Sequence, residues 1–80
     1  MLGVVSVIIE DPEQYAREVN TILGEHKELI RGRLGLPFHE KDLGVIVVVV
    51  EGEIDIINGL TGQIGRLPSV SVKATFPPGF

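Results

Sequence analysis

The feature that most constrains the fold is an uninterrupted apolar run, VIVVVV, at residues 45–50. A strand with one face in water alternates apolar and polar residues, whereas a strand covered on both faces is apolar throughout. The β-branched side chains of this run favour a strand over a helix. We therefore predict a central strand, and something must cover each of its two faces.

Length and composition limit the classes of protein to consider. The chain has 80 residues, a net charge of −4 and no cysteine. A domain of this size buries only about 60% of its unfolded surface, which favours additional burial against a second subunit. The missing cysteines exclude disulfides and thiolate metal sites, and the negative charge disfavours direct nucleic-acid binding. The apolar runs fall far short of the roughly 20 residues that span a bilayer and no signal-like segment opens the chain, so we expect a cytoplasmic protein without membrane contact.

Apolar periodicity predicts the element order βαββαβ. Asp11 is the expected N-cap of the first helix, Pro12 suits its first position, Gln14 fits a capping box and Gly24 marks its end. The expected elements are strands at 3–10, 29–36, the valine run and 70–76, with helices from residue 12 to 24 and over 55–67.

The two halves of the chain resemble each other, because a shift of 41 residues lays VIIE at 7–10 over VVVE at 48–51. Two such βα units close naturally into a ferredoxin-like βαββαβ sandwich (ACT-like, α+β). This fold has a four-stranded antiparallel sheet with two helices on one face. We expect one domain at residues 1–76 and a flexible tail at 77–80.

The phase of the strands divides the sheet into a helix-covered face and a helix-free face. In strand 29–36 we expect Ile30, Leu34 and Leu36 on a buried face, and Arg31 and Arg33 on the other. On the helix-free face we expect an apolar stripe of Val4, Ile8, Val45, Val47 and Val49, with Arg31, Arg33, Ser71, Lys73 and Thr75 at its edges. An apolar centre with a polar rim is typical of an interface, so we predict a homo-oligomer, dimer or tetramer, assembled through this face. The alternative is a tolerated hydrophobic surface.

Few residues are candidates for a site. Strands one and three carry no aromatics for stacking RNA bases, and an acidic first corner would repel phosphate. Glu10 and Asp11 crowd that corner, where helix capping is the alternative to ligand binding.

Glycines recur every three residues in the second helix, leaving either a smooth strip for a ligand or only a weak helix. These effector-site candidates are Glu10, Asp11, Gly59, Gly62 and Gly65. His39 and Asp42 are weak metal candidates, since a lone histidine in a polar turn is usually solvated.

Several segments resemble one known family. They are Asp11 before a helix with Tyr15 and Val19-Asn20, the RxGLP turn at 33–37, the valine strand and GLTGQIGRLPSVSVK at 59–73. The chain is similar in these to the iron-only hydrogenase system regulators. That family is similar in fold to ACT domains and to the nickel-sensing domain of the nickel-responsive repressor, which implies an oligomeric ligand-sensing module with sites at subunit interfaces.

The resemblance to the nickel repressor is incomplete. Its metal-binding histidines and cysteine would fall within 34–43, where this chain has only His39, with Asp42 near the cysteine position. We therefore expect neither a nickel site of that type nor direct DNA binding, since strand one begins at residue 3 and no DNA-binding arm precedes it.

These observations favour a non-catalytic, homo-oligomeric regulatory domain of the iron-only hydrogenase system that binds a small effector at a subunit interface, near the first strand-to-helix corner and the glycine face. It would act through a protein partner or by sequestering the effector; the sequence identifies no cofactor. One alternative is a small enzyme of the dimeric α/β-barrel monooxygenase type, which needs a cavity lined by polar groups. Another is an assembly module without a ligand.

Overall fold

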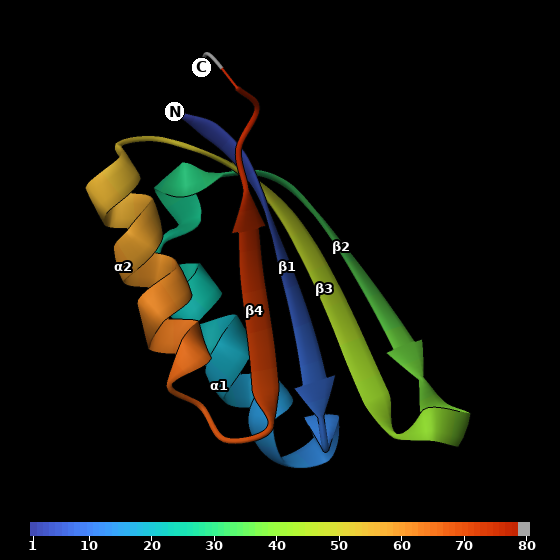
Figure 1. The fold of residues 1–80 in the computed structure, drawn as a ribbon. Coiled ribbons are helices and arrows are strands. Elements are labelled where there is room, and N and C mark those ends of the chain that lie inside the picture. Colours follow the sequence, from blue (N-terminus) through green and yellow to red (C-terminus); the bar gives the residue numbers. More distant parts are fainter. Residues whose placement is uncertain (79–80) are drawn as a thin grey trace.

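The protein folds into one antiparallel sheet with two helices packed on it. The structure, a computed structural model, describes residues 1–78. The strands are β1 (Leu2–Glu10), β2 (Ile30–Phe38), β3 (Leu43–Glu51) and β4 (Val70–Thr75), arranged in the order β2-β3-β1-β4. The α-helices are α1 (Pro12–Glu25) and α2 (Ile54–Gly65), and the 3-10 turns are η1 (Lys27–Leu29) and η2 (His39–Lys41). Figure 1 shows both α-helices on the same side of the sheet, which confirms the predicted βαββαβ sandwich.

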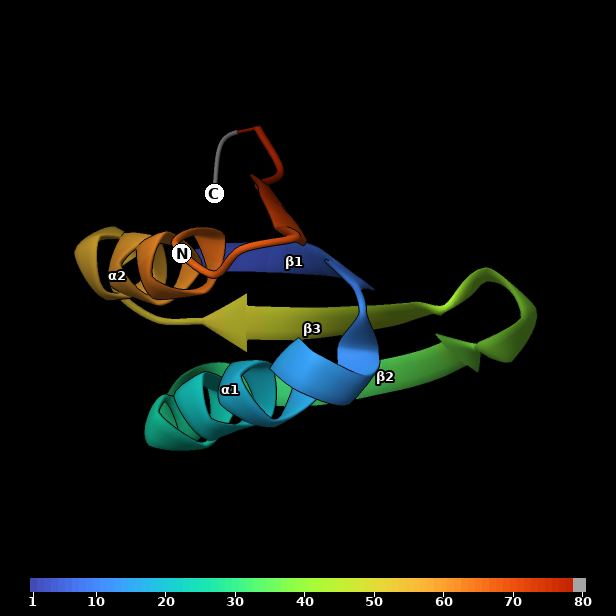
Figure 2. The same cartoon turned by 90° about the horizontal axis from the view of Figure 1, so that it is seen from below.

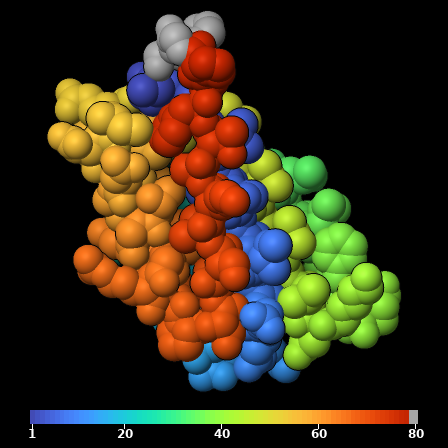
Figure 3. Space-filling model, viewed as in Figure 1, coloured from blue at the N-terminus to red at the C-terminus, as the bar shows by residue number. Residues whose placement is uncertain are grey.

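The hairpin of β2 and β3 extends beyond the helices. The molecule measures 39 × 20 × 17 Å along its principal axes. In Figure 2 the turn between β2 and β3 projects past the start of α1, and Figure 3 shows the same turn standing out from one corner of the body. Only the first residues of α1 approach this turn.

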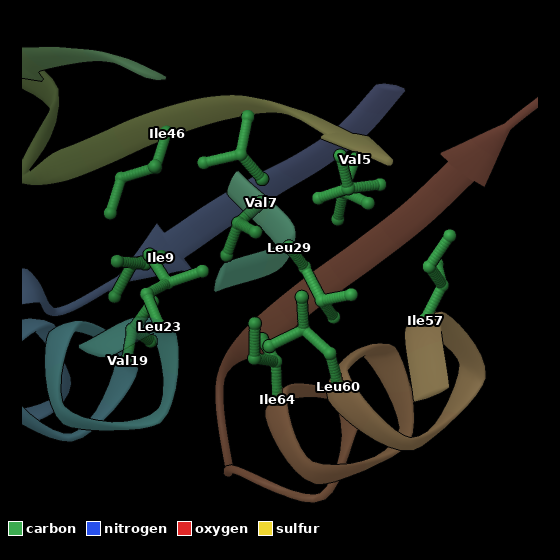
Figure 4. Close-up of a cluster of buried hydrophobic side chains, with 12 residues drawn as sticks. Val5, Val7, Ile9, Val19, Leu23, Leu29, Ile46, Ile57, Leu60 and Ile64 are labelled. Carbon is green, nitrogen blue, oxygen red and sulfur yellow. The ribbon is translucent and has the colours of Figure 1, made fainter. Parts of the chain in front are cut away.

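The core lies between the helices and one face of the sheet. From the two central strands, every second residue points inward, and α1 and α2 supply the opposing side chains (Figure 4). The buried residues are Val5, Val7, Ile9, Ile46, Val48, Val50, Val19, Leu23, Leu29, Ile57, Leu60 and Ile64. No polar or charged side chain is buried within residues 1–78. The buried positions of β1 and β3 alternate with Val4, Ile8, Val45, Val47 and Val49, which agrees with the predicted division of these strands into two faces.

The predicted faces of β2 are wrong beyond its first residues. The register places Ile30 opposite Val50 but Gly32 opposite Val49, so one extra residue forms a bulge at Arg31. After a bulge, the alternation of side chains between the two faces shifts by one position. Leu34 is consequently 56% exposed on the helix-free face instead of buried.

The first helix begins where the sequence predicts, but not by the predicted capping. Asp11 has φ 63 and ψ 62, in the left-handed region, and its side chain makes no capping hydrogen bond. An N-cap side chain reaches the helix N–H groups from an extended backbone, which Asp11 does not have. The Asp11 carbonyl still accepts hydrogen bonds from the N–H groups of Gln14 and Tyr15 at 3.1 and 3.2 Å, while Pro12 fills the first position. The capping-box role predicted for Gln14 is therefore also wrong.

The carboxyl-terminal end differs slightly from the expectation. β4 ends at Thr75, and Phe76 is still packed against the core, where its ring occupies the space beside Gly3. Of the predicted flexible tail, residues 79–80 lie outside the described residues, and the tail stays a prediction. None of the helices in the described part of the chain is long and apolar enough to cross a bilayer.

Candidate functional site

The helix-free face of the sheet, called the open face below, is apolar at its centre. Its predicted members Val4, Ile8, Val45, Val47 and Val49 fall there together, because Val4 is paired with Val49 and Ile8 with Val45 in the register of β1 and β3. Val4 is 43% exposed and Ile8 is 44% exposed. These side chains form one surface that this chain alone leaves in water.

The open face is wider than the sequence indicates. Leu34 lies opposite Val47 and Leu36 opposite Val45, so β2 adds two large apolar side chains to the stripe. Sequence reasoning missed Leu34 and Leu36 because the alternation of apolar and polar residues in β2 does not reveal the bulge at Arg31. The apolar surface therefore extends across three neighbouring strands, β2, β3 and β1.

The polar rim of the open face lies mainly along β4. Ser71, Lys73 and Thr75 are opposite Ile8, Ser6 and Val4, which confirms their predicted places. Arg31 also reaches this face at one end, where its Nε lies 3.0 Å from Oε1 of Glu51. The prediction for Arg33 is wrong: its register partner is Val48, on the helix-covered face. One edge of the open face is thus polar and the other is apolar.

A cavity of about 470 Å³ lies where the start of α1 meets the β2–β3 turn. His39 and Asp42 both line it, together with Glu13 from α1. The structure thus brings the two weak metal candidates to one cavity. Within the described residues, however, no three His, Cys, Asp or Glu side chains are grouped closely enough to hold a metal ion.

A second cavity, of about 240 Å³, continues from the first along the space between α1 and β2. The two share Pro12, Pro37 and Gly44, and we call them together the α1–β2 groove. At its inner end, Nη2 of Arg33 donates a hydrogen bond to Oδ1 of Asn20 at 2.6 Å. No pattern in the sequence predicts this groove, because its walls come from three strands and a helix.

The predicted effector residues do not line the groove. Glu10 and Asp11 immediately precede it, at the corner where the Glu10 N–H donates to the Ser69 carbonyl at 2.8 Å. On α2, Gly59 and Gly62 are exposed and have no neighbour within 4 Å of an added Cβ, whereas Gly65 faces Val72 of β4. The five residues do not form one cavity wall, and an effector site among them stays a prediction.

Solved structures share this fold. An uncharacterized protein, TM1266, from Thermotoga maritima is 31% identical, with a TM-score of 0.88 and 92% of each chain covered. An ACT domain protein from Streptococcus pneumoniae is 15% identical, with a TM-score of 0.62 over 94% of this chain and 88% of its own. A formyltetrahydrofolate deformylase from Pseudomonas putida KT2440 is 13% identical, with a TM-score of 0.68 over 96% of this chain and 29% of its own. The last two likenesses show the fold alone.

The family comparison covers nearly the whole chain. A family model described as "Iron-only hydrogenase system regulator, putative" matches residues 1–74. No curated protein matches significantly. The matched range includes every strand except the last residue of β4, and it agrees with the resemblance expected from the sequence. The chain belongs to the TM1266-like family.

Proposed function

We propose that this chain is a cytoplasmic, non-catalytic, homo-oligomeric regulatory domain that binds a small effector and acts in the iron-only hydrogenase system. The family description and the ACT-like fold support the regulatory role. The regulator would act through a protein partner or by sequestering its effector, without direct contact to nucleic acid, in keeping with its net charge of −4.

The open face is the observation that carries the proposal. Val4, Ile8, Leu34 and Leu36 are each between 43% and 56% exposed, on a sheet over which residues 1–78 place no second layer on this side. A contiguous exposed apolar surface usually marks an interface, and β-rich apolar surfaces aggregate unless a specific partner covers them. A second copy offers the same apolar centre and the same polar edge, as a two-fold interface requires.

The effector is the second part of the proposal. A regulatory domain needs a concave surface, and the α1–β2 groove, with cavities of about 470 and 240 Å³, falls near the size range of small-molecule sites. The groove starts at Pro12, directly after the predicted corner of Glu10 and Asp11. We place the effector at this end of the molecule; involvement of the α2 glycines would require a second subunit.

Molar mass in solution tests the assembly. Light scattering on a size-exclusion column at low micromolar protein should give a dimer or a tetramer. A monomer at that concentration contradicts the homo-oligomer and leaves the open face for another partner.

A thermal-shift panel of amino acids, carboxylic acids, nucleotides and metal ions tests the effector. A ligand that binds only the folded state raises the Tm. An oligomer that no compound stabilises would favour the ligand-free assembly module. Chemical turnover of a bound compound would favour the enzyme alternative of the α/β-barrel monooxygenase type.

A further inference from the structure

We propose that the α1–β2 groove binds an amphipathic monocarboxylate, with the carboxylate on Arg33 and the apolar part lying over Gly35 and against Pro12. This proposal names the chemical class of the effector. Only the regulatory role of the bound ligand rests on the proposed function. The binding itself depends on residues of one chain.

The floor of the groove is apolar because side chains are missing where the sheet would otherwise fill it. Gly35 lies opposite Ile46 in the register, and Gly44 lies between Ile9 and Pro37. A Cβ added at Gly35 would meet nothing within 4 Å, so the space above it is open. Gly44 is covered by Pro12, whose Cβ would lie 3.4 Å from an added Cβ, so the bare backbone is that of Gly35. Together with the aliphatic side chains around it, this backbone gives an apolar surface for a hydrocarbon chain.

The inner end of the groove carries one positive charge. Among the described residues that line the smaller cavity, Arg33 is the only charged one, and Asn20 is the only other with a polar side-chain amide or hydroxyl. A guanidinium has five N–H donors in a rigid fork that matches a carboxylate. The 2.6 Å bond from Nη2 to Asn20 orients the fork and uses one of these donors. The remaining donors can form charge-assisted bonds to an anion.

The opposite end of the groove determines how many charges the ligand carries. Glu13 and Asp42 line the larger cavity there, and carboxylates disfavour a second anionic group nearby. Phe38 and Leu43 supply apolar contacts beside them. A ligand with one carboxylate and an apolar remainder fits both ends, whereas a dicarboxylate or a phosphate monoester, each with two charges, fits only one.

Sodium hexanoate is the probe for this site. Titration of the isotope-labelled full chain, followed by amide NMR shifts, should perturb residues of β2, β3 and the start of α1. Hexylamine, with the same chain and the opposite charge, should not bind there. Comparable affinity for the two compounds would overturn the role of Arg33.

Matched variants test whether hexanoate binds in the groove or on the surrounding surface. Arg33→Leu should weaken hexanoate binding at least about tenfold, the loss expected for a charge-assisted hydrogen bond. Arg31→Leu, two residues away on the same strand but paired with Glu51, should leave it unchanged. Gly35→Val fills the open space with a residue that strands favour, and should abolish binding without unfolding the protein. Equal losses for Arg31→Leu and Arg33→Leu, or binding that survives Gly35→Val, would overturn the inference.

Light scattering on the same samples keeps the two proposals apart. An oligomer that does not bind hexanoate contradicts the monocarboxylate site but still supports the proposed assembly. A monomer that binds hexanoate with the expected variant pattern supports the site and contradicts the assembly.

Discussion

Leu34 of β2 lies directly opposite Val47 of β3, and both side chains are on the open face. The pair joins the edge strand to the centre of the apolar surface, and Val47 in turn faces Ser6 of β1. The candidate interface therefore begins at the β2 edge and ends towards β4, where Lys73 and its neighbours are polar.

Val47→Lys and Leu34→Lys should each convert the oligomer to a monomer at low micromolar protein. A lysine ammonium in the middle of an apolar interface loses its hydration without gaining a partner. Ser71→Lys is the control, because Ser71 lies on the same face at the polar edge. Light scattering measures the mass, and circular dichroism should report a retained fold. An assembly that tolerates both apolar-to-lysine changes would show that this face is not the contact.

Leu60→Ala should lower the free energy of unfolding by about 2 to 5 kcal/mol, because it removes a fully buried side chain from the core. Ile56→Ala is the control on the same helix, since Ile56 is 48% exposed and loses little burial. Urea unfolding measures both. A loss of similar size at the two positions would contradict the orientation of α2.

Gly62→Ala should raise the free energy of unfolding by about 0.8 to 1 kcal/mol, the difference in helix propensity between the two residues. The position is exposed, and nothing lies within 4 Å of the added Cβ. Gly65→Ala should gain less, because its Cβ would lie 3.3 Å from Cγ1 of Val72. Thermal unfolding compares them. If Gly62→Ala also removes binding of an effector found in the panel, the predicted glycine site gains support over the groove.

Gly52→Ala should destabilise the fold by about 1 to 3 kcal/mol, as overpacking of a core does. The added Cβ would collide with Cδ2 of Leu29, a buried residue of η1. Gly24→Ala is the matched change in open space, near the end of α1, and should not destabilise. Unfolding in urea distinguishes the two, and equal stability of both variants would argue against the tight contact between Leu29 and the β3–α2 turn.

Most of the fold followed from periodicity, but the orientation of β2 did not. Arg31 and Arg33 alternate with apolar residues in the sequence, so simple alternation puts both on one face. The bulge separates them: Arg31 pairs with Glu51 near the open face, and Arg33 bonds Asn20 of α1. Whether a strand contains an extra residue depends on its fit to the neighbouring strand, which is a tertiary property.

The candidate site was harder to predict for the same reason. Glycines are conspicuous on α2, where Gly59 and Gly62 face only solvent, but Gly35 and Gly44 matter more for the shape of the surface. Their effect arises because the register and the placement of α1 leave the backbone of Gly35 bare and set Pro12 against Gly44. No spacing rule within one strand contains that information.

The hairpin of β2 and β3 has a consequence for the dynamics of the molecule. In the described part of the chain, β2 pairs with no strand other than β3, and its residues from Arg31 to Phe38 are all exposed, so little buried surface resists a local opening. Amide hydrogens that β2 contributes to the sheet should therefore exchange with deuterium well before those of β1. Since β2 forms one wall of the groove and one edge of the open face, either a bound carboxylate or a second subunit would slow that exchange. Hydrogen exchange in β2 would thus report both ligand binding and assembly.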